Sequence, residues 1–168
     1  MSELDAALVA LQMAIQTEID GHNFYQRFAQ QSGDPNAQQM FDRLARDEIM
    51  HLEMLRNTKA MLEQSGEWAE YRGLALDVAQ GAPIFSQERV QQNVVAHTSD
   101  LSALRVAYLI EKDAVDFYTR AAAQTDNPNG RRMFRDLADM EQGHLRLLEG
   151  EYNRLMRYFQ TEMGFAPF

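Results

Sequence analysis

The chain of 168 residues contains no cysteine. This absence excludes disulfides, thiolate nucleophiles, and zinc or iron–sulfur sites that need thiolate ligands. A metal ion bound to this chain would therefore have oxygen and imidazole ligands. Basic residues are also scarce, because 16 Lys and Arg stand against 25 Asp and Glu, and the net charge is −9. An acidic protein of this kind is a poor partner for nucleic acid.

Long apolar runs are missing as well. No stretch approaches the roughly 18 apolar residues of a membrane span, so we expect no membrane partner. The first residues, 1–5, lack the basic segment and apolar run of a signal peptide, and we expect a cytoplasmic protein. The length and the 45% hydrophobic content are those of one compact domain, which we expect to span residues 1–168.

The chain repeats itself with a shift of 93 residues. Between residues 18–55 and 111–148, 17 of 38 aligned positions are identical, without a gap. A solenoid needs about three or more units, so two copies indicate a pair of similar supersecondary units that face each other.

Each unit has the pattern of a helical hairpin. Apolar residues recur at alternating spacings of three and four, and breaks fall at Asp34-Pro35 and Asn127-Pro128, where Asp34 and Asn127 suit the helix N-cap. The pattern predicts an all-α, antiparallel four-helix bundle made of two hairpins, about 3–64 and 100–162. The expected helices are 3–31, 35–64, 100–125 and 128–162.

A crossover of about residues 65–99 joins the two hairpins. It is too long for a tight turn, so it can carry the chain from the end of the second helix to the start of the third. Its aromatic residues indicate that it packs on the bundle, and these are Trp68, Tyr71 and Phe85.

Six ionisable residues occupy inward positions of the predicted helices. An ionised carboxylate in a dry core must be paired, protonated or bound to metal, and no Lys or Arg shares these stripes. The six candidate metal ligands are Glu18, Glu48, His51, Glu111, Glu141 and His144.

Two Glu-x-x-His motifs, 48–51 and 141–144, lie in register in the two repeats. Three residues along a helix turn 300°, so the Glu and the His share one face about 4.5 Å apart along the axis. Each motif follows an inward Glu by 30 residues. Four glutamates carry four negative charges, which two divalent ions neutralise. The pattern predicts a dinuclear site of iron, with manganese as an alternative and zinc as a possible substitute.

This pattern resembles the rubrerythrin-like proteins of the ferritin-like di-iron carboxylate superfamily. The resemblance implies that Glu18 and His51 serve one metal and Glu111 and His144 the other, with Glu48 and Glu141 bridging. It also implies that Tyr25 and Tyr118 are catalytic residues that donate hydrogen bonds to glutamate ligands.

The sequence departs from full-length rubrerythrins in three ways. It has no rubredoxin domain, so electrons must come from a separate donor protein. An extra carboxylate of that family corresponds here to Ala114, with Gly21 as its repeat counterpart. Asp47, which we expect to orient His144, has Met140 as its counterpart.

One more histidine lies on the inward stripe. His22 follows Glu18 by one turn, and its repeat counterpart is Val115. We expect His22 to form hydrogen bonds behind the ligands or in the core rather than to bind metal directly.

The resemblance favours a di-iron oxidoreductase that reduces peroxide or dioxygen, with peroxidase or ferroxidase activity and a role in oxidative stress. A manganese catalase and a substrate hydroxylase are alternative enzymes that would use the same ligands. A further alternative is a non-enzymatic iron-binding or carrier protein. We expect a homodimer or a larger homo-oligomer.

Overall fold

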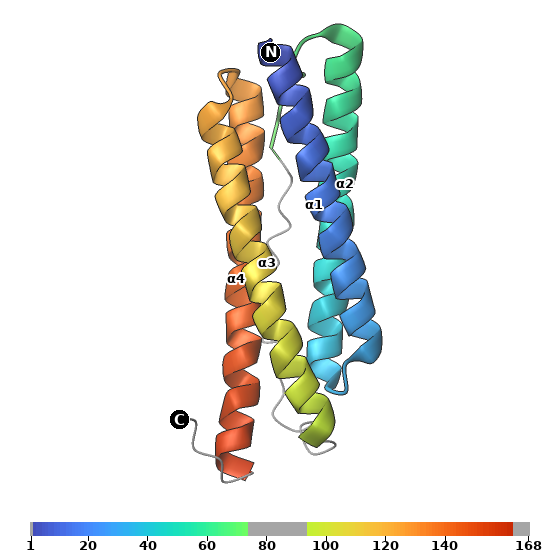
Figure 1. Ribbon diagram of the computed structural model, residues 1–168, viewed down its shortest axis with the longest axis vertical. Helices are drawn as coiled ribbons and strands as arrows, with labels where there is room; N and C mark the ends of the chain where they lie inside the picture. Colours follow the sequence, from blue (N-terminus) through green and yellow to red (C-terminus); the bar gives the residue numbers. More distant parts are fainter. Residues whose placement is uncertain (1, 74–93, 163–168) are drawn as a thin grey trace.

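The computed structural model describes residues 2–73 and 94–162, with backbone only for 94–99 and 162. This part of the chain contains four long helices and no strand, as Figure 1 shows. The helices are α1 (Glu3–Gln31), α2 (Pro35–Ser65), α3 (Val94–Gln124) and α4 (Pro128–Glu162). The predicted all-α four-helix bundle of two hairpins is therefore confirmed.

Side-chain caps set the starts of α1, α2 and α4. Ser2 and Asp5 form a capping box at the start of α1. Asp34 accepts hydrogen bonds from the backbone N–H groups of residues 36 and 37, and Pro35 opens α2. Asn127 accepts from the N–H groups of residues 129 and 130 in the same way. Both breaks between helices thus use the residues that the sequence suggested.

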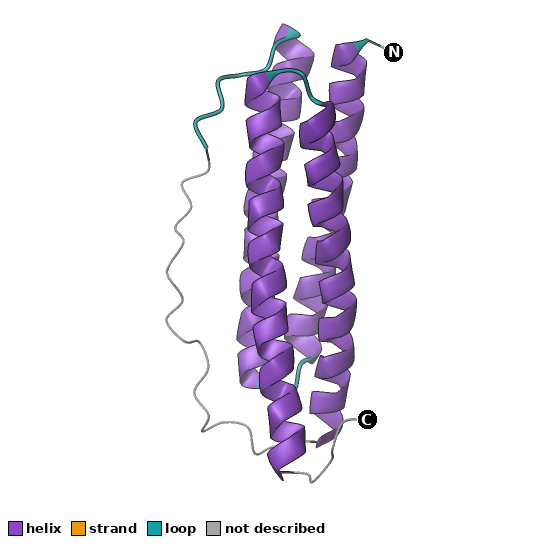
Figure 2. Cartoon of the chain, turned by 90° about the vertical axis from the view of Figure 1, so that its left-hand side faces the viewer, coloured by secondary structure: helices purple, strands orange, loops and turns teal. Residues whose placement is uncertain are grey.

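The two hairpins lie side by side along the long axis of the molecule (Figures 1 and 2). Packing is closest within the pairs α1 with α2 and α3 with α4, and α1 also contacts α3 while α2 contacts α4. In Figure 1, α2 ends at the top and α3 begins at the bottom. Neighbouring helices consequently run antiparallel.

One predicted boundary differs. We expected the third helix at residue 100, but α3 already begins at Val94, so the crossover is shorter than 65–99. Residues 94–99 include Val, His, Thr and Ser, whose helix propensities are low, so the sequence there favours a helix only weakly. Residues 74–93, with Phe85, lie outside the described residues.

Apolar residues form two clusters along the bundle. One includes Leu11, Leu55 and Phe134, and the other includes Phe41 and Leu148. On every helix the six candidate ligands lie between the residues of these two clusters. Trp68 and Tyr71, from the start of the crossover, pack against the first cluster, as expected. None of the described helices is both long enough and apolar enough to cross a membrane.

Candidate metal centre

All four helices contribute to a buried polar layer in the middle of the bundle. Its six charged or ionisable side chains are at most 5% exposed. α1 and α3 each supply one glutamate, and α2 and α4 each supply a Glu-x-x-His motif. The layer brings together the six predicted ligands: Glu18, Glu48, His51, Glu111, Glu141 and His144.

The six residues form two overlapping groups, each compact enough to surround one ion. Within each group, one ligand atom per residue lies within 4.8 Å of all the others. One group adds Glu18 and His51, and the other adds Glu111 and His144, to a shared pair of glutamates. The shared pair is Glu48 and Glu141.

The shared glutamates each present one oxygen to each histidine. Nδ1 of His51 lies 3.2 Å from Glu48 Oε2 and 3.1 Å from Glu141 Oε1. Nδ1 of His144 lies 3.5 Å from Glu48 Oε1 and 2.7 Å from Glu141 Oε2. A carboxylate whose two oxygens face different histidines has the geometry of a ligand that bridges two ions.

The outer glutamates each approach a single histidine. Glu18 Oε2 lies 3.2 Å from His51 Nδ1, and Glu111 Oε1 lies 3.4 Å from His144 Nδ1. The two imidazole rings stack, with centroids 5.6 Å apart and an interplanar angle of 19°. Both rings therefore turn Nδ1 toward the carboxylates.

Three buried atoms of this layer have no hydrogen-bond partner of suitable geometry among the described residues. They are Oε1 and Oε2 of Glu141 and Nδ1 of His144. Buried polar atoms in native proteins have partners, and a cation held between carboxylate and imidazole ligands is one. The donor set therefore fits a pair of divalent metal ions.

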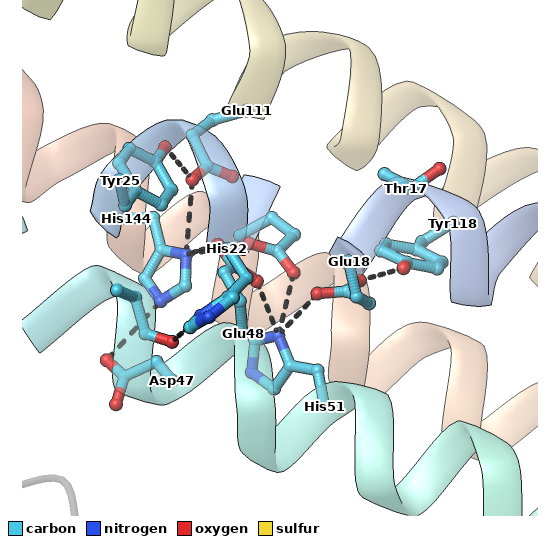
Figure 3. Close-up of polar contacts among 12 residues, drawn as sticks. Thr17, Glu18, His22, Tyr25, Asp47, Glu48, His51, Glu111, Tyr118 and His144 are labelled. Atoms are coloured by element: carbon cyan, nitrogen blue, oxygen red, sulfur yellow. Dashed lines mark hydrogen bonds and ion pairs between the residues drawn. The ribbon is translucent and has the colours of Figure 1, made fainter. Parts of the chain in front are cut away.

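Two tyrosines form the outer ends of the layer in a reciprocal way (Figure 3). The Tyr25 hydroxyl of α1 donates a hydrogen bond to Glu111 Oε1 of α3, and the Tyr118 hydroxyl of α3 donates to Glu18 Oε1 of α1. Both tyrosines are fully buried. Each outer glutamate is thus held from behind by a residue of the neighbouring helix.

Asp47 and His22 lie around this layer. Asp47 Oδ2 is 3.5 Å from His144 Nε2, the nitrogen that faces away from the glutamates. His22 forms a hydrogen bond of 2.9 Å between Nδ1 and the Ala45 carbonyl, and it belongs to neither group of potential ligands. The structure places both residues where the sequence analysis expected a supporting role.

Comparison with known proteins supplies the family. The family model described as Rubrerythrin matches residues 10–152. The chain belongs to the rubrerythrin family. Among solved structures, a hypothetical protein from Pyrococcus furiosus is similar, with 24% identity, a TM-score of 0.69, and coverage of 90% of this chain and 91% of that chain. This likeness supports the fold alone. No curated protein gives a significant match.

In this member of the rubrerythrin family, burial and charge divide the glutamates into two kinds. Burial, followed by the charge of Glu141, raises the pKa of Glu111 to about 8. Burial and the charges of Glu48 and Glu141 likewise raise the pKa of Glu18 well above its usual range. Without metal, Glu111 therefore holds a proton at neutral pH, and Glu18 keeps its proton to a higher pH than an exposed glutamate does.

The shared glutamates behave in the opposite way. Burial alone would raise the pKa of Glu48, but the nearby imidazoles of His144 and His51 outweigh it and bring the pKa far below its usual range. The pKa of Glu141 is also lowered, because the histidine charges outweigh burial and the charge of Glu48. Burial would lower the pKa of both histidines, yet Glu141 and the other carboxylates raise it.

Neither of the two repeat-related positions for the extra carboxylate of the family, Ala114 and Gly21, carries a carboxylate here. Ala114 is 5% exposed, and Gly21 lies so close to Glu48 that an added Cβ would be 3.5 Å from the carboxyl carbon. Neither residue can supply a ligand. The candidate metal ligands are therefore four glutamates and two histidines.

A second buried polar cluster was missed in the sequence analysis. The guanidinium of Arg154 lies 2.7 Å from Asp34 Oδ1 and 2.6 Å from Glu151 Oε1. The carboxylate of Asp100 accepts from the backbone N–H of Asp34 at 3.2 Å. Glu151 follows His144 by seven residues on the inward stripe of α4. That spacing could have predicted from the sequence that Glu151 is buried.

Proposed function

We propose that the chain is a di-iron carboxylate oxidoreductase that reduces hydrogen peroxide or dioxygen with electrons from a separate donor protein. The observation that carries the proposal is the pair of overlapping ligand groups with two glutamates in common. Two iron ions per chain, a homo-oligomeric state and a cytoplasmic location belong to the same proposal.

Iron bound in this site would supply redox chemistry and open coordination positions for an oxygen species. The chain's own residues prepare the site for that chemistry. Glu48 and Glu141 are ionised before metal arrives, so a cation that binds there would displace protons from the neighbouring histidines rather than from these two carboxyl groups. Tyr25 and Tyr118 hold the outer glutamates at fixed angles through their hydroxyl groups.

Burial favours a small reactant over a large one. The six ligands are at most 5% exposed, which suits a molecule the size of peroxide or dioxygen. A cavity of about 380 Å³ exists elsewhere, on α3 and α4, and its lining includes Leu104, Tyr108, Leu148 and Tyr152 but none of the six ligands. The site geometry therefore favours peroxide or dioxygen reduction over hydroxylation of a large substrate.

The test compares two reactions of the iron-loaded protein. Peroxide consumption with ascorbate as the reductant measures peroxidase activity, and oxidation of added ferrous iron by dioxygen measures ferroxidase activity. His51→Gln removes a proposed ligand, while His22→Gln removes a nearby histidine that belongs to neither group. We expect activity to be lost only in the first variant. Iron binding without turnover in either reaction would contradict the proposal and favour an iron carrier.

A further inference from the structure

A row of aromatic rings joins the metal centre to Trp68, the only tryptophan of the chain. The Tyr118 hydroxyl donates to Glu18, and the Tyr118 ring stacks on Phe134 with centroids 6.3 Å apart and an interplanar angle of 22°. Trp68 meets Phe134 edge-on, with centroids 6.2 Å apart. Tyr118 and Phe134 are fully buried, whereas Trp68 is only partly buried. The row therefore leads from a proposed metal ligand toward solvent.

The repeat provides an internal comparison for this row. Tyr25 donates to Glu111 and stacks on Phe41, with centroids 6.1 Å apart, in the same way. That second row continues to Phe28, another phenylalanine, at 5.9 Å. The shift of 93 residues takes Trp68 to Thr161, which is exposed. Only the row on the side of Glu18 therefore ends in an indole.

The start of α4 is adapted to Trp68. A Cβ added to Gly130 would lie 2.7 Å from Cζ2 of Trp68, closer than real Cβ contacts allow. The repeat counterpart of Gly130 is Ala37, so an alanine suits this helical position where no indole is present. Gly130 thus lets the indole lie directly against the helix backbone.

We propose that Trp68 and Tyr118 form an electron relay, in which Trp68 receives electrons from the external donor and Tyr118 passes them to the metal centre. This proposal rests on the proposed function, because hydrogen peroxide reduced at that centre is the oxidant. Tyrosine and tryptophan are the side chains that lose one electron most readily. Phenylalanine does not, and Phe134 serves as the packed contact between them.

The relay transfers one electron at a time, and each transfer returns Tyr118 and Trp68 to their starting states. Tyr118 loses an electron to the metal centre, and its hydroxyl proton moves along the hydrogen bond to Glu18. An electron from Trp68 then restores Tyr118, and the proton returns from Glu18. The external donor reduces the oxidised indole. Two such cycles, with two protons from solvent, convert one hydrogen peroxide into two water molecules.

The test uses the iron-loaded full chain with hydrogen peroxide and with ascorbate as the donor. Trp68→Phe keeps an aromatic ring against Phe134 but removes the oxidisable indole. Gly130→Ala keeps the indole and displaces it. Tyr118→Phe breaks the relay at the metal, and Tyr25→Phe is the matched control, because it removes the same kind of hydrogen bond from the row without tryptophan.

Two measurements other than turnover report on the relay directly. With peroxide and no ascorbate, freeze-quenched electron paramagnetic resonance should show a tryptophan radical. Mass spectrometry should then find oxygen added to Trp68. We expect both signals in the parent and in Tyr25→Phe, and neither in Tyr118→Phe or in the metal-free protein.

With ascorbate present, we expect peroxide consumption to fall in Trp68→Phe, which leaves the proposed ligands and their hydrogen bonds in place. It should fall further in Tyr118→Phe, which also removes the hydrogen bond to Glu18. Gly130→Ala should lose part of the rate. Tyr25→Phe should lose only what its hydrogen bond to Glu111 contributes, a smaller loss than in Tyr118→Phe. Peroxide consumption that is unchanged in Trp68→Phe, with no radical in the parent, would overturn the relay and leave the proposed function intact. A parent protein that consumes no peroxide would overturn both.

Discussion

The carboxylate of Asp47 lies 3.5 Å from Nε2 of His144, on the side of the ring that faces away from the glutamates. At the repeat-related position beside the other motif stands Met140, which has no carboxylate. Among the described residues, the hydrogen bonds and ion pairs of His51 all involve Nδ1. The two halves of the centre therefore differ in the support given to their histidines, although their ligands are the same.

This difference predicts two unequal metal affinities. A carboxylate on the outer imidazole nitrogen fixes the tautomer and strengthens the ligand, and its loss typically costs about 10–100-fold in affinity. The His51 side should bind metal more weakly in the parent. Asp47→Asn should weaken the His144 side by about that factor and reduce the difference. Calorimetric titration of the metal-free protein with ferrous iron under anaerobic conditions measures both affinities.

The reverse substitution serves as a control for that experiment. Met140→Asp should tighten the weaker side, because it gives His51 the kind of partner that His144 already has. Equal affinities in the parent, or no response to Asp47→Asn, would show that the outer nitrogen does not determine the binding strength.

A second prediction concerns the pH dependence of the metal-free protein. The pKa of Glu111 rises from its ordinary value of 4.5 to about 8 in the folded state, and that of Glu18 is also raised. The folded protein therefore keeps protons that the unfolded chain releases above pH 4.5. This contribution to stability is complete below the unfolded pKa and is lost as pH rises through the folded pKa. The raised histidine pKa values act in the same direction above pH 6.5.

The melting temperature of the chelated protein should accordingly fall between about pH 6 and about pH 9. The double variant Glu18→Gln with Glu111→Gln imitates the protonated state, so its melting temperature should fall less over this range. In the parent, saturating metal should raise the melting temperature at every pH in this range, because metal binds the folded site. A chelated parent that melts at the same temperature throughout would show that the buried carboxyl groups are not protonated as described.

A third prediction separates a helix cap from a buried ion pair. Asp34 caps α2 and also lies 2.7 Å from the Arg154 guanidinium, whereas its repeat counterpart Asn127 caps α4. Asn127→Ala should cost about 1 kcal/mol of unfolding free energy, the value of a cap. Asp34→Ala should cost about 3–5 kcal/mol, because it also breaks a buried ion pair.

Denaturant unfolding of the metal-free protein measures both values. Asp34→Asn keeps a capping side chain and removes the charge, so its cost should fall between those of the two alanine variants. Equal costs for the two alanine variants would show that Arg154 contributes nothing at this end of the bundle.

The sequence predicted most of the fold because the repeat and the 3.6-residue periodicity agree. Three of the four helix starts carry a capping residue or a proline, and there the predicted boundaries hold within one residue. The start of α3 was placed at residue 100, six residues too late. The six inward residues were found because charged groups on an apolar stripe conflict with burial.

Other features depend on how the helices pack, which no local pattern encodes. The reciprocal bonds of Tyr25 and Tyr118 were expected only through the family resemblance. The contact of Arg154 with Asp34 joins residues 120 positions apart at one end of the bundle. The contact of Trp68 with Gly130 likewise depends on where the chain leaves α2.

The central claim is that Glu48 and Glu141 bridge two ions, and metal stoichiometry tests it most directly. Elemental analysis after anaerobic iron loading and removal of free metal should give two ions per chain, because the two ligand groups share this pair. The variant Glu48→Ala with Glu141→Ala should stay helical by circular dichroism and bind no iron. One ion per chain in the parent, or unchanged iron content in the double variant, would contradict the account.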